Sequence, residues 1–270
     1  MTTTEHAFDV GTALEPLGGG RYRGRVDEDW WIDKGPNGGY LAAVVLRGLM
    51  LEVNDAARLP RSLSVHYVAR PVEGVVEVAA VLERVGRSTT ATTGRLTQDG
   101  ELLATAQAVF SAARNGPSFD DDPAPATPPP EEIPELEVPK EMFPRFAWNF
   151  DYRWAIGSLP YSAAERALSG GWIRPKSPRP LDPLLVATYA DGWPPSLFAR
   201  LQTPAAVPTI DLTIHFRAPG ELAHAPDWTL VSFETKVAAG GFIEEDGRIW
   251  DRNGVLLAQS RQLALYQDPR

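Results

Sequence analysis

Asp191 is the residue of this sequence whose type and setting best suit acid–base chemistry. It comes late in the apolar segment 181–191, which is typical of a buried helix. A carboxylate that loses its water there, near a helix C-terminus, has a raised pKa, which suits a general base near neutral pH. Two further polar residues of the same half of the chain, Thr209 and Gln262, stand on predicted strands. These three are candidate functional residues.

Most other catalytic motifs are missing from the sequence. The chain has no cysteine, which excludes a disulfide scaffold, a Cys₄ zinc site and a cysteine nucleophile. It has no Gly-x-Ser-x-Gly, His-Glu-x-x-His or Walker motif, and no Gly-x-Gly-x-x-Gly between a strand and a helix. We therefore expect no metal and no cofactor. His66 and His215 occupy equivalent strand positions, and we interpret them as structural.

The two halves of the chain resemble each other. Residues 62–67 and 211–216 both alternate polar and apolar side chains, at an offset of 211 − 62 = 149. Residues 99–104 resemble residues 253–258 at an offset of 154, and each begins with Asp-Gly or Asn-Gly, a strong hairpin signal. A repeat of this length indicates a duplicated domain.

Comparison of the copies selects the same polar residues. Gln262 stands where the first copy has Ala108, at an offset of 154, and Thr209 stands where it has Pro60. Strict strand alternation turns Thr209 away from the face of Leu212, although a bulge near the start of the strand would turn it inward. A structural role stays open, in which Gln262 satisfies a backbone group and Asp191 caps the following turn.

Residues 115–144 are rich in proline and acidic residues and carry most of the net charge of −9. Proline excludes helix and central strand, so we expect an extended, solvated connector. It separates a first domain at 21–114 from a second domain at 145–270, and residues 1–20 form an N-terminal segment. A long surface loop within a single domain is the alternative.

Each domain has one apolar helix followed by strands. The first helix is expected at 38–50, with Asn37 as N-cap, and the second starts with Asp182 as cap and Pro183 in the first turn. One buried helix followed by a curved antiparallel sheet means that the sheet wraps the helix. We therefore expect an α+β fold, a double hotdog of two tandem repeats.

Residues 209–217 and 254–262 resemble the acyl-CoA thioesterase II family of double-hotdog enzymes and, more broadly, the thioesterase-like superfamily. The resemblance covers both repeats. It implies hydrolysis of a fatty or other acyl-CoA by direct attack of water, in fatty acid metabolism, with Asp191, Thr209 and Gln262 holding that water. A thioester is electrophilic and its thiolate leaves readily, so no covalent nucleophile is required.

The glycines that open the first helix are the candidate oxyanion and substrate-binding donors, since the backbone N–H groups of Gly38 and Gly39 are free at a helix start. Two departures from the family pattern lie near the site. Tyr40 follows the glycine pair where the family usually has Gln. The second helix also ends early, because Asp191 is followed by Gly-Trp-Pro-Pro.

Coenzyme A is polyanionic and the chain is acidic, so CoA must be bound by local cations. The candidates are Arg174, Lys176 and Arg179, in one loop, and Arg87. Alternatively, these residues only keep their loops soluble.

The composition also limits the binding partners and the cellular location that can be expected. The negative charge argues against a nucleic-acid partner. No apolar run approaches the roughly 18–20 residues of a membrane span. The first residues lack the features of a signal peptide, so we expect a cytoplasmic protein. We also expect a homo-oligomer, a dimer or higher, formed through exposed sheet surfaces.

Two other functions are compatible with the fold. A non-catalytic acyl-CoA or acyl-thioester binding protein would keep the three polar residues with a closed pocket. A hotdog dehydratase or hydratase is disfavoured, because no Asp and His pair at the short spacing that this chemistry uses.

Overall fold

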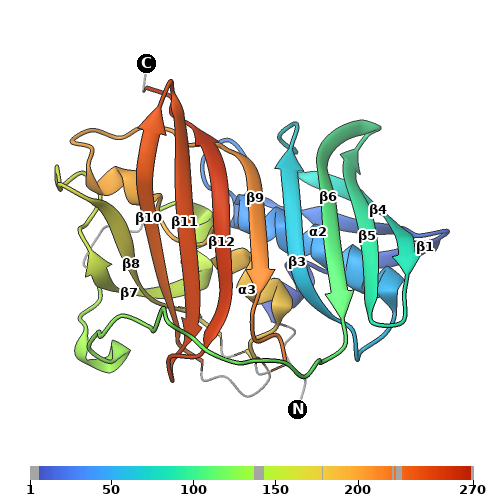
Figure 1. Ribbon diagram of the computed structural model, residues 1–270. Helices are drawn as coiled ribbons and strands as arrows, with labels where there is room; N and C mark the ends of the chain where they lie inside the picture. Colours follow the sequence, from blue (N-terminus) through green and yellow to red (C-terminus); the bar gives the residue numbers. More distant parts are fainter. Residues whose placement is uncertain (1–5, 137–142, 178, 221, 223–226, 269–270) are drawn as a thin grey trace, which may run out of the picture.

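The strands of both repeats join in one antiparallel sheet of twelve strands, in the order β1-β2-β4-β5-β6-β3-β9-β12-β11-β10-β8-β7 (Figure 1). The computed structural model describes residues 6–136, 143–177, 179–220, 222 and 227–268. The order is palindromic about β3 and β9, so each repeat contributes the same succession of strands outward from the centre. The predicted duplication and the double hotdog are confirmed.

The strands of the first repeat are β1 (Glu15–Gly18), β2 (Arg21–Val26), β3 (Leu59–Tyr67), β4 (Gly74–Val85), β5 (Thr89–Gln98) and β6 (Glu101–Ser111). Those of the second repeat are β7 (Phe150–Gly157), β8 (Ala167–Pro175), β9 (Thr209–Phe216), β10 (Thr229–Ala239), β11 (Phe242–Asp251) and β12 (Leu256–Leu265). The α-helices are α1 (Ala7–Gly11), α2 (Gly38–Val53) and α3 (Pro183–Tyr189). The 3₁₀ turns are η1 (Glu28–Trp30), η2 (Pro130–Glu132), η4 (Arg145–Asn149) and η5 (Ser196–Ala199).

The repeats meet where β3 pairs with β9. Ser64 and Thr213 face each other across this junction, with their hydroxyl oxygens 2.9 Å apart. They are 149 positions apart in sequence, the offset expected between equivalent residues of the two copies. The junction therefore lies on the approximate two-fold axis that relates the repeats.

Helices α2 and α3 lie against one face of the sheet (Figure 1). Asn37 caps α2 as predicted, since its Oδ1 accepts the N–H of Tyr40 at 2.9 Å. Most residues of α2 and all of α3 are buried, which explains why both segments are apolar on nearly every side. Asp182 caps α3 by accepting the N–H of Leu185 at 2.8 Å.

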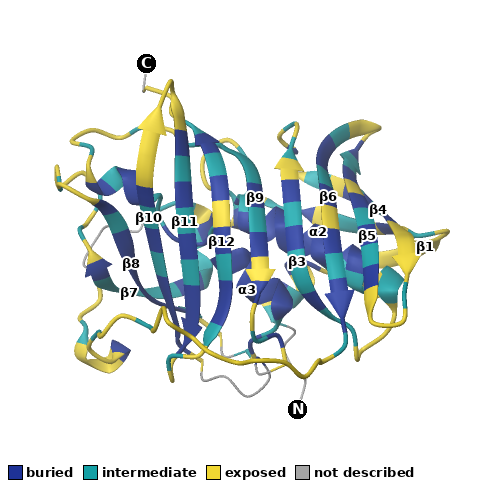
Figure 2. Ribbon diagram, in the orientation of Figure 1, coloured by how far each residue is buried: buried dark blue, intermediate teal, exposed yellow. Residues whose placement is uncertain are grey.

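Along the strands, buried and more exposed residues alternate (Figure 2). One face of the sheet packs on the helices and the other faces outward, as a half-buried antiparallel sheet requires. Both predicted Asp-Gly and Asn-Gly turns connect neighbouring strands, and Asp99 and Gly100 adopt positive φ angles of 51° and 84°. His66 and His215 are exposed strand residues.

The described part of the proline-rich segment is mostly exposed and lacks strands, as expected of a connector, but some of it packs against the second repeat. Trp172 donates its indole N–H to the carbonyl of Pro128 at 3.0 Å, and Ala124 and Ile133 pack against a second apolar cluster. That cluster consists of Ile156, Trp172, Trp228, Leu230 and Trp250. These aromatic side chains need a cover, and the segment provides it. Residues 137–142 lie outside the described residues.

The acidic residues of this segment bind arginines of the second repeat. The ion pairs are Asp122 with Arg248, Glu131 with Arg252 and Glu135 with Arg153. The division into domains at 21–114 and 145–270 stays a prediction, because one sheet and one apolar core run through both repeats. No helix in the described part of the chain is long and apolar enough to cross a membrane.

Candidate active site

The N-terminus of α2 meets the C-terminal end of α3, and this contact creates the site. A Cβ atom at Gly39 would lie 2.5 Å from the carbonyl oxygen of Thr188 and 3.0 Å from that of Ala187. Only glycine allows the two backbones to approach so closely. Asp191 lies just past the end of α3, which brings it beside the first residues of α2.

We had expected Asp191 inside the second helix. It lies instead two residues past the end of α3. Its Oδ2 accepts the backbone N–H of Gly39 and the side-chain amide of Asn37, both at 3.1 Å. The Asn37 amide also donates to the backbone carbonyl of Asp191 at 2.6 Å. Tyr67 donates its hydroxyl to the carbonyl of Gly38 at 2.6 Å. The first repeat therefore positions the carboxylate that the second repeat supplies.

Thr209 and Gln262, two of the candidate residues, lie in contact. The Thr209 hydroxyl donates to Oε1 of Gln262 at 2.9 Å. Nε2 of Gln262 donates to Oε1 of Glu245 at 2.7 Å. Gln262 is buried, and its amide bonds to two side chains rather than to a backbone group. Gln262 therefore does not satisfy a backbone group, and its catalytic role stays a prediction.

A β-bulge turns Thr209 toward Gln262. Asp211 and Thr209 pair with consecutive residues of β12, so Ile210 is the extra residue of the bulge. An extra residue reverses the alternation of side chains along a strand. The expectation from strict alternation is therefore wrong for Thr209. The first repeat has the same irregularity at Arg61.

The pKa of Asp191 is raised to about 7, mainly because the carboxyl group is buried and in part because of the nearby Glu245. Hydrogen bonding from Gly39, Gln262 and Gly38 opposes this rise by favouring the carboxylate form. The direction agrees with the sequence expectation. The helix end that acts on the carboxylate is the N-terminus of α2, however, and it stabilises the charge.

Gly38 and Gly39 lie at the site, but Asp191 already accepts the N–H of Gly39. To serve as an oxyanion donor, this amide would have to exchange the carboxylate for a substrate oxygen. The oxyanion role of the two glycines stays a prediction.

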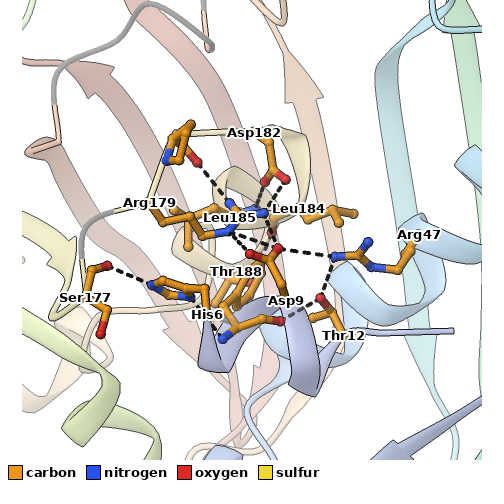
Figure 3. Close-up of polar contacts among 12 residues, drawn as sticks. His6, Asp9, Thr12, Arg47, Ser177, Arg179, Asp182, Leu184, Leu185 and Thr188 are labelled. Carbon is orange, nitrogen blue, oxygen red and sulfur yellow. Dashed lines mark hydrogen bonds and ion pairs between the residues drawn. The ribbon is translucent and has the colours of Figure 1, made fainter. Parts of the chain in front are cut away.

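Arg179 is held in an ion-pair network rather than presented to solvent (Figure 3). Its guanidinium donates to Asp182 at 2.6 Å and to Asp9 of α1 at 2.7 Å. Only 8% of its side chain is exposed. Asp9 also lies 3.7 Å from Arg47 of α2. Arg179 thus ties the N-terminal segment to the start of α3, and Asp9 extends the network to α2; a CoA contact of Arg179 stays a prediction.

The other predicted CoA contacts have different surroundings. Arg174 pairs with Asp151 and Asp227 and stacks 4.4 Å above the ring of Trp228. Lys176 is exposed beside an aromatic-lined cavity of about 200 Å³. Of the two, Lys176 is the better placed to meet a phosphate, because Arg174 already has two carboxylate partners.

Arg87 is exposed in the turn between β4 and β5. This turn lies at the end of the sheet where β3 begins, whereas Tyr67 of the site ends β3. The nine residues of β3 separate the two ends by roughly 26 Å at 3.3 Å per residue. CoA contact by Arg87 stays a prediction.

Sequence reasoning missed Glu245 and Ser196. Glu245 stands between two other acidic residues, Glu244 and Asp246, a pattern typical of a solvated strand. Its alternation with Ile243 does place it on the inner face, and this signal could have revealed it. Within the described ranges, no group of three or more His, Asp or Glu side chains could hold a metal ion.

Both repeats match models of one protein family. Residues 26–111 match the acyl-CoA thioesterase N-terminal domain, and residues 126–266 match the acyl-CoA thioesterase C-terminal domain. The chain belongs to the acyl-CoA thioesterase family. No curated protein matches its sequence.

Solved structures share the fold of this acyl-CoA thioesterase family member. A hot dog fold protein of unknown function from Alicyclobacillus acidocaldarius is 29% identical, with a TM-score of 0.92 over 99% of this chain and 100% of that one. A putative thioesterase II from Thermobifida fusca is 24% identical (TM-score 0.84, 97% and 98% covered). The acyl-CoA thioesterase II TesB2 from Mycobacterium marinum is also 24% identical (TM-score 0.77, 97% and 99% covered). The last two show likeness of fold alone.

Proposed function

We propose that this protein hydrolyses acyl-CoA thioesters by direct attack of water. One observation carries the proposal: Thr209 and Gln262 are hydrogen-bonded to each other close to Asp191, whose pKa of about 7 suits a general base. Only the second repeat has these residues, so each chain holds one site, completed by the α2 N-terminus of the first repeat.

The three side chains have separate roles in the proposed reaction. Gln262 and Thr209 orient a water molecule by hydrogen bonds, which is a proximity effect. Asp191 accepts a proton from this water as its oxygen attacks the thioester carbonyl carbon. The C–S bond then breaks, and the proton passes to the departing CoA thiolate. The products are a carboxylic acid and free CoA.

General-base catalysis of this kind contributes about 10²–10⁴-fold to the rate. If Gly38 or Gly39 donates to the developing oxyanion, its loss would cost about 10²–10³-fold. The leaving thiolate is stable, so these contributions suffice without a covalent intermediate.

The proposal includes the setting of the reaction. The substrate is a fatty or other acyl-CoA. Of the predicted cations, Lys176 is the first candidate to bind its phosphates. The protein would act in fatty acid metabolism in the cytoplasm, as a homo-oligomer joined through exposed sheet surfaces.

A non-catalytic acyl-CoA binding protein is the second candidate. One observation favours it: Asp191 accepts hydrogen bonds from Gly39 and Asn37 and so already stabilises the start of α2. In that case the carboxylate would be structural and would move no proton.

Thiol release from a panel of acyl-CoAs, from short to long chains, separates the two candidates. The protein has no cysteine and therefore contributes no thiol signal. Turnover with a preferred chain length supports the thioesterase. Saturable acyl-CoA binding without thiol release supports the binding protein, and a change in enoyl-CoA absorbance with the thioester intact would indicate a hydratase instead.

A further inference from the structure

Glu245 is a carboxylate in the interior of the second repeat, with only 5% of its surface exposed. Its Oε1 accepts the amide of Gln262 at 2.7 Å. Its Oε2 accepts both the backbone N–H of Ser196, at 2.6 Å, and the Ser196 hydroxyl, at 2.5 Å. Three donors thus compensate for the loss of water, which a buried carboxylate requires.

This contact selects one orientation of the Gln262 amide. An ionised carboxylate only accepts hydrogen bonds, so it requires the NH₂ group of Gln262 on its side. Thr209, on the other side, has a hydroxyl that donates or accepts, and it would tolerate either orientation. Glu245 therefore decides that Oε1 of Gln262 faces Thr209.

Ser196 extends the contact to the segment that carries Asp191. It opens η5 in the chain just after Asp191, and its hydroxyl also lies 3.0 Å from that of Thr235 in β10. Glu245 of β11 thus accepts hydrogen bonds both from the segment that follows Asp191 and from the Gln262 side chain.

The first repeat lacks both partners of this pair. Glu245 and Gln262 are directly opposite each other on β11 and β12. The corresponding pair on β5 and β6 is Thr92 and Ala108. The buried carboxylate and the amide occur together, in the repeat that has the catalytic residues, and neither occurs in the other.

We propose that Glu245, held by Ser196, is a positioning residue that fixes the Gln262 amide for the attack of water. The inference rests on the proposed function. Glu245 would act through Gln262 and would not touch the substrate.

The test is a double-mutant cycle between Glu245→Gln and Gln262→Ala, read as kcat and KM for thiol release. Misplacement of a water-holding group costs on the order of 10²-fold, so Glu245→Gln should lower kcat by about 10–100-fold with little change in KM. In a protein that already carries Gln262→Ala, Glu245→Gln should lower kcat by less than about a further threefold, since the amide that Glu245 positions is gone. Glu244→Gln, on the outer face of the same strand, is the matched control and should keep wild-type kcat.

Equal losses from Glu245→Gln on both backgrounds, or wild-type kcat in Glu245→Gln, would overturn the proposal. If Glu245→Gln fails to fold, Ser196→Ala replaces it in the double-mutant cycle with Gln262→Ala. This variant removes a single side-chain hydrogen bond from Glu245.

A second readout does not depend on activity. The side-chain amide of Gln262 gives ¹H–¹⁵N signals that disappear in Gln262→Ala and are assigned in this way. These signals should be unchanged in Glu244→Gln and should shift and broaden in Glu245→Gln. If the signals of Glu245→Gln were identical to those of the wild type, the positioning role would be refuted. If wild-type protein releases no thiol, the proposed function fails, and this readout decides the positioning by itself.

Discussion

The backbone N–H of Gly39 donates to Oδ2 of Asp191 at 3.1 Å, although the two residues are 152 positions apart in sequence. The helix of the first repeat therefore holds the carboxylate of the second. Neither repeat alone contains this arrangement, because one copy supplies the helix start and the other supplies the polar residues. Duplication followed by divergence of the copies explains a single composite site.

Gly39→Ala tests the close approach of the helices. The added Cβ would meet two backbone carbonyls, at 2.5 Å and 3.0 Å, which cannot move without shifting α3. We expect a loss of about 1–3 kcal/mol in the free energy of unfolding, measured by urea denaturation, and a fall in kcat. Gly116→Ala is the control, because nothing lies within 4 Å of its Cβ position. Equal stability of the two variants would contradict the packing argument.

The pKa of Asp191 predicts the pH dependence of the rate. A general base acts in its deprotonated form, and burial raises the pKa of Asp191 to about 7. We therefore expect kcat/KM to rise about tenfold per pH unit below pH 7 and to level off above it. A profile that is flat between pH 5 and pH 8 would show that Asp191 is not the base.

The same pKa predicts a pH dependence of stability. The folded pKa lies above the ordinary value of 3.8, so the folded protein binds this proton more tightly than the unfolded chain does. The stabilisation is complete below pH 3.8 and is lost as the pH rises through about 7. In Asp191→Asn the side chain stays neutral, so its Tm relative to wild type should increase between pH 5 and pH 8. A difference in Tm that does not change with pH would refute the shifted pKa.

Arg179→Met separates structural roles from CoA binding. Arg179 is nearly buried and pairs with Asp9 and Asp182, so its loss should cost about 1–3 kcal/mol of unfolding free energy. KM for acyl-CoA should stay within about twofold of wild type. The exposed Arg87 provides the matched control, Arg87→Met, which should leave stability unchanged. A raised KM with unchanged stability would instead place Arg179 at the CoA phosphates.

The fold could be predicted because the repeat is visible in the sequence. Asn37 and Asp182 each precede an apolar segment as helix caps, and the strand patterns recur at nearly constant offsets. The path of residues 115–144 could not be predicted, since proline shows only what a segment does not form. Whether such a segment covers a sheet depends on what the sheet exposes, here a cluster that includes Trp172 and Trp250.

The site could be predicted only in part. Gln262 and Thr209 differ from their counterparts in the first repeat, and this difference selected them. The bulge at Ile210 has no sequence signal of its own, so alternation placed Thr209 on the wrong face. Glu245 was missed because its partner lies on the next strand, and the contact becomes visible only with the register of β11 and β12.

The central claim is that Asp191 and Gln262 activate water for thioester hydrolysis. The most direct test measures thiol release from the preferred acyl-CoA by the wild type, Asp191→Asn and Gln262→Ala, with Asp121→Asn, exposed in the connector, as control. We predict a fall in kcat of about 10²–10⁴-fold for Asp191→Asn, a clear fall for Gln262→Ala, and wild-type turnover for the control. Wild-type turnover in a folded Asp191→Asn variant would contradict the account.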